Sequence, residues 1–123
     1  MPTTIRIAPP YSLIFVSDVD GGTSPECTGG RSGSLWATPS CIAVGCLMYQ
    51  DGETEISLGP ARDVDPGGRP VFDGALETPN RAVIISTAEH ETVLNARVQS
   101  ESTRVRIWTN HPTEPDRVVV GLG

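Results

Sequence analysis

Apolar residues in this chain recur mostly at every second position, the period of strands with one buried face. The alternating segments are short, and glycine, proline, asparagine or aspartate bounds most of them. The pattern predicts an all-β fold: a mainly antiparallel β-sandwich of about eight short strands with little helix. The expected strands cover residues 5–7, 11–17, 41–49, 53–58, 82–85, 93–98, 104–108 and 116–122, with 71–72 as a further short strand or turn and an ordered stretch beginning at 35–37.

The longest apolar run, Cys41–Tyr49, is followed by Asp51-Gly52 and then by the alternating segment Glu53–Leu58. Asp-Gly between two such runs predicts a β-hairpin, because a two-residue turn needs positive φ and glycine adopts it without a Cβ clash. Leu47 would then lie opposite Ile56. The first run, apolar on both faces, is expected to be a central strand, and the second to lie nearer an edge.

The segments 93–98 and 104–108 predict a second hairpin, with Gln99–Ser102 as its turn. In that register Leu94 opposes Ile107 on the core side, and Arg97 opposes Arg104 on the outer face. Residues 86–89, Ser-Thr-Ala-Glu, have the order of a capping box that would open a helix. The alternation that follows favours a strand instead.

At 123 residues, the chain is expected to form a single domain over residues 1–123. Residues 18–34 are glycine-rich and carry no apolar period, which predicts one long loop. Its segment Gly29–Ser34 lacks the Gly-Lys-Ser/Thr ending of a phosphate-binding loop, so we interpret it as surface chain.

The net charge is −6, and every basic residue except the two histidines is arginine. Residues 1–80 hold ten acids and four arginines, whereas residues 81–123 hold five of each. Bulk attraction to nucleic acid is not expected of such a chain, but attraction to a basic protein is. The candidate partner-binding residues are Asp18, Asp20, Glu53, Glu55, Asp63 and Asp65, and the alternative patch, on the outer face of the late hairpin, is Arg97, Arg104, Arg106 and Trp108.

Three cysteines, with no signal peptide and no membrane-length apolar run, predict reduced thiols in a cytoplasmic protein. Neither histidine has neighbours at a zinc-binding spacing, so no metal or cofactor is expected. The two Asp-Val-Asp turns, at 18–20 and 63–65, would offer oxygen ligands to Ca²⁺, although such residues also simply terminate strands. The rival reading is a small enzyme or small-ligand-binding protein that uses Cys27, His90 or His111 in a cleft under the 18–34 loop. No nucleophile motif supports it, and we expect a non-enzyme.

Two stretches carry a family resemblance: the apolar CIAVGCLMY with its polar partner ETEISL, and the ending RVRIWTNHPTEPDRVVVGL. Their order resembles the competence protein J family, small bacterial inhibitors of a DNA-entry nuclease. The resemblance implies an all-β fold and binding to a nuclease, and it supplies no individual site residue. We therefore expect a small acidic cytoplasmic binding protein that inhibits a basic partner such as a nuclease. The sequence does not indicate its oligomeric state.

Overall fold

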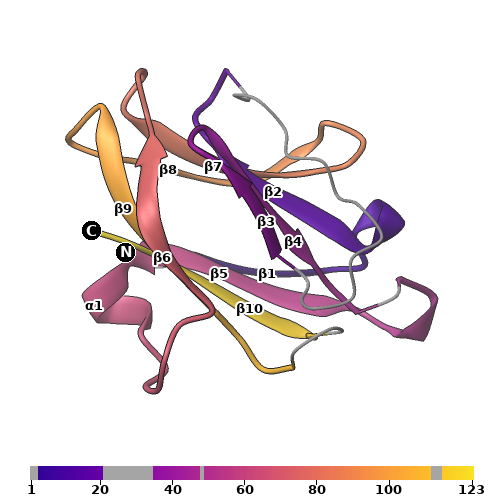
Figure 1. Cartoon of the computed structure of the whole chain (residues 1–123). Helices are drawn as coiled ribbons and strands as arrows, with labels where there is room; N and C mark the ends of the chain where they lie inside the picture. Colours follow the sequence, from indigo (N-terminus) through magenta and orange to yellow (C-terminus); the bar gives the residue numbers. More distant parts are fainter. Residues whose placement is uncertain (1–2, 21–34, 48, 112–114) are drawn as a thin grey trace.

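The computed structural model describes residues 3–20, 35–47, 49–111 and 115–123. Its strands form two five-stranded sheets that pack face to face, so the predicted β-sandwich is confirmed (Figure 1). Sheet A has the order β1 (Thr3–Ile7), β5 (Thr54–Pro60), β10 (Arg117–Leu122), β9 (Ser102–Thr109), β6 (Phe72–Glu77). Sheet B has the order β3 (Leu35–Thr38), β4 (Cys41–Gly45), β2 (Leu13–Ser17), β7 (Ala82–Thr87), β8 (Thr92–Arg97).

The described helical structure consists of three short segments outside the sheets. They are the 3₁₀ turns η1 (Pro10–Ser12) and η2 (Tyr49–Asp51), and the single α-helical turn α1 (Ala61–Val64), which follows β5 directly. In the described ranges, no helix is long and apolar enough to cross a membrane.

The core lies between the sheets and consists of the alternating apolar residues. Ile14, Ile42 and Ile85 from sheet B, with Ile107 and Val118 from sheet A, are completely buried. Because successive strand residues point to opposite faces, burying every second one leaves the intervening positions to face outward. All five residues of β4 are buried, which agrees with the central strand expected from its apolar run.

The predicted hairpin across Asp51-Gly52 is wrong. β4 pairs with β2 and β3 in sheet B, whereas β5 pairs with β1 and, in parallel, with β10 in sheet A. The chain between them crosses from one sheet to the other. Leu47 therefore does not face Ile56; its backbone N–H donates to the carbonyl oxygen of Pro115. Gly52 does adopt positive φ, as expected, but within a longer crossover.

The late hairpin is wrong for the same reason. β8 pairs with β7, and β9 pairs with β6 and β10, so residues 98–101 also connect the two sheets. Leu94 and Ile107 are both buried, as predicted, but they come from opposite sheets. The predicted opposition of Arg97 and Arg104 is not formed.

Residues 88–91 form a turn between β7 and β8, and no helix begins at the predicted capping box. β7 continues to Thr87, whose side-chain oxygen accepts hydrogen bonds from the backbone N–H groups of Glu89 and Glu91. His90 occupies the left-handed region of this turn, with φ of 65°. The hydroxyl of Thr87, next to the predicted capping residue Ser86, therefore stabilises a tight strand-to-strand connection.

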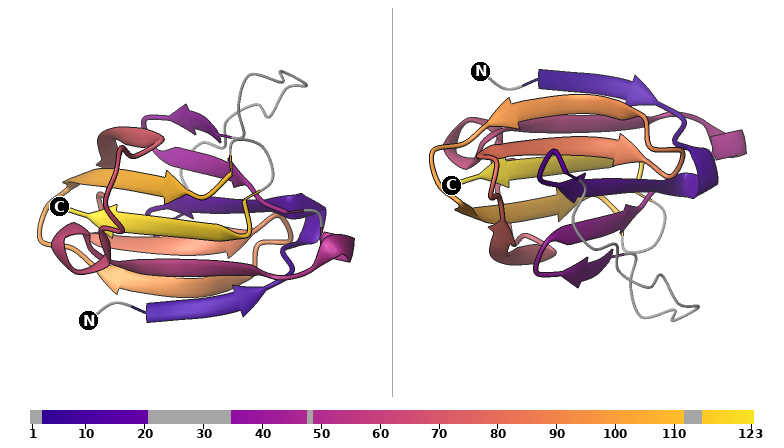
Figure 2. Two further views of the ribbon diagram at one scale, coloured as in Figure 1. Left: turned by 90° about the horizontal axis from the view of Figure 1, so that it is seen from below. Right: turned by 90° about the horizontal axis from the view of Figure 1, so that it is seen from above.

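The sandwich has two distinct ends. The C-terminal end of β10 and the α1 turn lie together at one end, and η2 lies at the other (Figure 2). The β5 strand runs between them, with seven residues from Thr54 to Pro60, which at roughly 3.3 Å per residue is about 20 Å. We call the first the α1 end and the second the η2 end.

Candidate protein-interaction site

Asp18, a predicted partner-binding residue, is buried and serves the fold. It is 1% exposed. Its Oδ1 accepts the backbone N–H of Asn80 at 2.9 Å, and its Oδ2 accepts Asn80 Nδ2 at 2.6 Å and the backbone N–H of Asp20 at 3.2 Å. Burial opposes ionisation, but these hydrogen bonds outweigh it and hold the pKa of Asp18 below its ordinary value. The carboxylate joins the end of β2 to the turn before β7 and is not available to a partner.

The remaining predicted acids do not form one surface. Glu53 and Glu55 lie at the η2 end, at the start of β5. Asp63 and Asp65 lie on and just after α1, beyond the other end of the same strand. About 20 Å separates the two groups, which exceeds the Debye length of about 10 Å at 0.1 M salt. They therefore form two separate patches of negative charge.

Six of the thirteen described acids lie at the η2 end, with only two arginines, and we call it the acidic end. The backbone N–H of Glu55 donates to the carbonyl oxygen of Asp116, which places the start of β5 beside the start of β10. Thr87 pairs with Ile14, so the 88–91 turn lies at the same end as η1 and η2, on the right of Figure 1. The described charged residues of the acidic end are Asp51, Glu53, Glu55, Glu89, Glu91 and Asp116, with Arg6 and Arg117.

Both arginines of the acidic end are engaged by one acid. Arg6 and Arg117 approach the two oxygens of Glu55 at 3.4 Å and 3.2 Å. No described arginine lies within 4.0 Å of the other five carboxylates. The acidic end therefore presents a strong negative potential to solvent.

Tyr11 is a large exposed side chain at this end. It is 74% exposed, and its backbone has φ of 58° and ψ of 14°, the left-handed region that costs an L-residue about 1–2 kcal/mol. The following Ser12 also has φ of 58°. Its turn, η1, packs against η2. Two adjacent residues in this strained conformation hold an aromatic ring out in solvent beside the acids.

The alternative patch is divided between the sheets. Arg97 belongs to β8, while Arg104, Arg106 and Trp108 belong to β9. Trp108 is only 5% exposed, and its Nε1 donates to the carbonyl oxygen of Gly68 at 3.4 Å. It lies under the segment after α1, so it is a structural residue and not part of an exposed interface.

The arginines of β9 contact other parts of sheet A. Arg104 makes two hydrogen bonds with Asp73 on the neighbouring β6, at 2.9 Å and 2.7 Å, and this guanidinium holds the pKa of Asp73 below its ordinary value. Arg106 Nη2 donates to the backbone oxygen of Gly123 at 2.7 Å. Its Nε is buried without a hydrogen-bond partner, an arrangement that costs about 1–3 kcal/mol.

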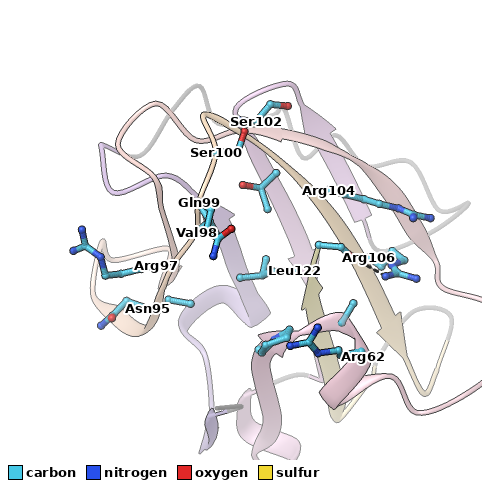
Figure 3. Close-up of a pocket in the computed structure, with 16 residues that line it drawn as sticks. Arg62, Asn95, Arg97, Val98, Gln99, Ser100, Ser102, Arg104, Arg106 and Leu122 are labelled. Atoms are coloured by element: carbon cyan, nitrogen blue, oxygen red, sulfur yellow. Dashed lines mark hydrogen bonds between the residues drawn. The ribbon is translucent and has the colours of Figure 1, made fainter.

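A pocket of about 680 Å³ opens at the α1 end. Its walls come from the end of β5, α1, β8, the crossover after β8, β9 and the end of β10 (Figure 3). A Cβ at Gly121 would meet the Cα of Ala61 at 2.9 Å, so glycine lets α1 pack closely against β10 beside this pocket. Periodicity could not have located it, because its wall residues are scattered from Gly59 to Gly123.

The residues of the rival enzyme reading do not converge. Cys27 and the cleft under the 18–34 loop lie largely outside the described residues. His90 and His111 are exposed in different loops. Cys41 and Cys46 are both buried free thiols, and burial raises the pKa of Cys46 to about 12, so it does not act as a thiolate. In the part of the chain that is described, no three His, Cys, Asp or Glu residues form a metal-binding group, and this includes both Asp-Val-Asp turns.

Comparison with known proteins gives a structural match alone. No protein-family model matches the chain, and no curated protein matches it in sequence. The fold is similar to the crystal structure of ComJ from Bacillus subtilis, described as the inhibitor of the DNA-degrading activity of NucA. The match has a TM-score of 0.58 and 12% identity, and it covers 99% of this chain and 93% of that one. The resemblance to the competence protein J family is thus confirmed at the level of the fold.

Proposed function

We propose that this protein binds a nuclease and inhibits its degradation of DNA. The observation that carries the proposal is the agreement in fold with ComJ over essentially the whole of both chains. The chain's net charge of −6 supports the same reading, since a nuclease that holds DNA phosphates presents a basic surface. The buried free thiols are compatible with the reducing cytoplasm, where we place this activity.

The contact face in this proposal is the acidic end. Five carboxylates there lack an arginine partner within the described residues, so they are available to guanidinium or ammonium groups of another protein. A negatively charged protein surface can occupy a basic DNA-binding site in place of the phosphate backbone. Asp18 is excluded from this face by its burial, and Asp63 and Asp65 by their position at the α1 end.

Tyr11 would add a short-range apolar contact to the partner, which the exposed charges of the acidic end do not provide. Exposed tyrosines are enriched among the residues that contribute most to protein binding, because the ring buries a large area with few rotatable bonds. Backbone strain of this kind is retained at functional sites when the surrounding structure enforces it. The backbone carbonyl of Ser12 is held by the N–H of Cys46 at 2.8 Å, which fixes the η1 turn to the sandwich.

Replacing Tyr11 with glycine should separate binding from folding. Glycine relieves the left-handed strain while it gains freedom in the unfolded chain, so the free energy of unfolding should stay within about 1 kcal/mol. Affinity for the nuclease should fall roughly tenfold. Val19→Ala is the matched control, because Val19 is 50% exposed and lies at the other end of the sandwich. If Tyr11→Gly binds the nuclease with unchanged affinity, then the Tyr11 ring is not part of the interface.

The function itself is tested by capture and inhibition. The purified chain, immobilised, should retain a DNA-degrading activity from a lysate of the source cell. That activity, once isolated, should be titrated to zero by the free protein at a fixed molar ratio. The variant with Asp51→Asn, Glu53→Gln and Glu91→Gln, immobilised in the same way, is the control and should retain less of this activity. Full DNA degradation in the presence of a large excess of the protein would overturn the proposal.

A further inference from the structure

We propose that the pocket at the α1 end binds a small organic oxyanion, a ligand that carries phosphate or carboxylate groups. The pocket is lined by sixteen residues, and four of them are arginines, whereas none is aspartate or glutamate. The whole chain has fifteen acids and only nine arginines. The arginines are Arg62, Arg97, Arg104 and Arg106.

These arginines come from three separate elements. Arg62 belongs to α1, Arg97 to β8, and the other two to β9. Figure 3 shows Arg62 below Leu122, Arg104 and Arg106 on one side of the hollow, and Arg97 on the opposite rim, pointing outward. The fold therefore places four arginines around one hollow from positions up to 44 residues apart in the chain.

Two of the four arginines have no side-chain carboxylate partner among the described residues. Arg104 is paired with Asp73, and Arg62 approaches Asp63 only at 4.0 Å with 89% of its side chain exposed. Neither Arg97 nor Arg106 has a side-chain carboxylate within 4.0 Å among the described residues. The backbone oxygen of Gly123 accepts one hydrogen bond from Arg106; a free terminal carboxylate there would offset one charge.

The rest of the lining defines the ligand class. Guanidinium presents its donors in a planar fork that matches phosphate and carboxylate oxygens. Ala96, Val98 and Leu122 add an apolar wall, and Gln99 and Ser102 add neutral polar groups. A volume of about 680 Å³ lies in the range of small-molecule sites. A small organic anion with an apolar body fits this combination better than a bare inorganic ion does.

The test is calorimetric titration of the full chain at constant ionic strength with three probes: inorganic phosphate, adenosine 5′-monophosphate and citrate. Saturable binding of the nucleotide identifies an organic phosphate as the source of the oxyanion, and saturable binding of citrate identifies a carboxylate. A bound probe at about 10 mM should raise Tm by roughly 5 °C if its Kd is near 1 mM.

Arg62→Gln and Arg106→Gln should each weaken binding about tenfold. Arg81→Gln is the control, because Arg81 is a surface arginine outside the pocket whose ion pair with Glu101 is long, at 3.7 Å. Arg62→Gln is the cleaner variant, since that side chain is 89% exposed and makes only one long ion pair, with Asp63. The proposal is overturned if no probe binds saturably, or if Arg81→Gln weakens binding as much as Arg62→Gln. Because the pocket and the acidic end lie apart, either result leaves nuclease inhibition untouched.

Discussion

Replacing Asp18 with alanine is expected to lower the free energy of unfolding by about 3 kcal/mol. The carboxylate accepts three hydrogen bonds in a site that is 1% exposed. Alanine removes both acceptor oxygens and leaves the backbone N–H and the side-chain amide of Asn80 without these partners. Chemical denaturation at pH 7 measures the loss directly.

Asp18 should also make stability depend on pH. Its folded pKa is depressed, whereas the unfolded side chain titrates near 3.9. As the pH falls, the unfolded chain takes up this proton first, so the unfolded state gains relative stability. The contribution of Asp18 is complete above its unfolded pKa and disappears as the pH falls through its folded pKa. The difference in stability between the wild type and Asp18→Asn should therefore shrink below about pH 4.

Asp63→Asn is the matched control, because it removes the same charge from a side chain that is 44% exposed at the end of α1. Its stability should stay within about 0.5 kcal/mol of the wild type at every pH. A cycle of Asp18→Ala with Asn80→Ala should show coupling, since Asn80→Ala removes the hydrogen bond from Asn80 Nδ2 to the carboxylate and keeps the one from its backbone N–H. A loss below 1 kcal/mol in Asp18→Ala, or additive losses in the cycle, would contradict this account.

The period-two pattern located strands and buried faces but not their pairing. Ile107 and Val120 are buried as the alternation predicted. Alternation defines which face of a strand meets the core, and this requirement is the same whether the next strand lies beside it or across the sandwich. The true neighbours of β5 are β1 and β10, from opposite ends of the chain, so no local turn signal specifies them.

The predicted site residues could not be sorted from sequence for a related reason: contacts between distant parts of the chain decide their roles. Asp18 and Asp63 stand in similar Asp-Val-Asp turns, and only a contact with Asn80, 62 residues away, makes one of them a buried structural group. The uneven charge of residues 1–80 and 81–123 likewise did not indicate position in the fold, because Glu53 and Asp63 flank β5 and so lie at opposite ends of the sandwich. Composition predicted an acidic partner surface, but only topology shows that the η2 end has six acids with two arginines, while an arginine-lined pocket lies at the other end.

Neutralising the acidic end is expected to slow association with the nuclease roughly ten- to a hundredfold at low salt. The variant carries Asp51→Asn, Glu53→Gln and Glu91→Gln, all exposed side chains, so the fold should be little affected. The physical reason is long-range steering: unpaired carboxylates at one end attract a basic surface before contact forms. Dissociation should change less, because exposed charges contribute little once the partners are docked.

The matched control neutralises three acids towards the α1 end: Asp20→Asn, Asp63→Asn and Asp65→Asn. Both variants change the net charge from −6 to −3, so any effect of overall charge is the same in the two proteins. Association rates measured from low salt to about 1 M, where the Debye length falls to about 3 Å, should converge for the wild type and the acidic-end variant. The control should follow the wild type throughout. If the control slows association and the acidic-end variant does not, then the partner binds at the α1 end, where Asp63 and Asp65 were first expected to contact it.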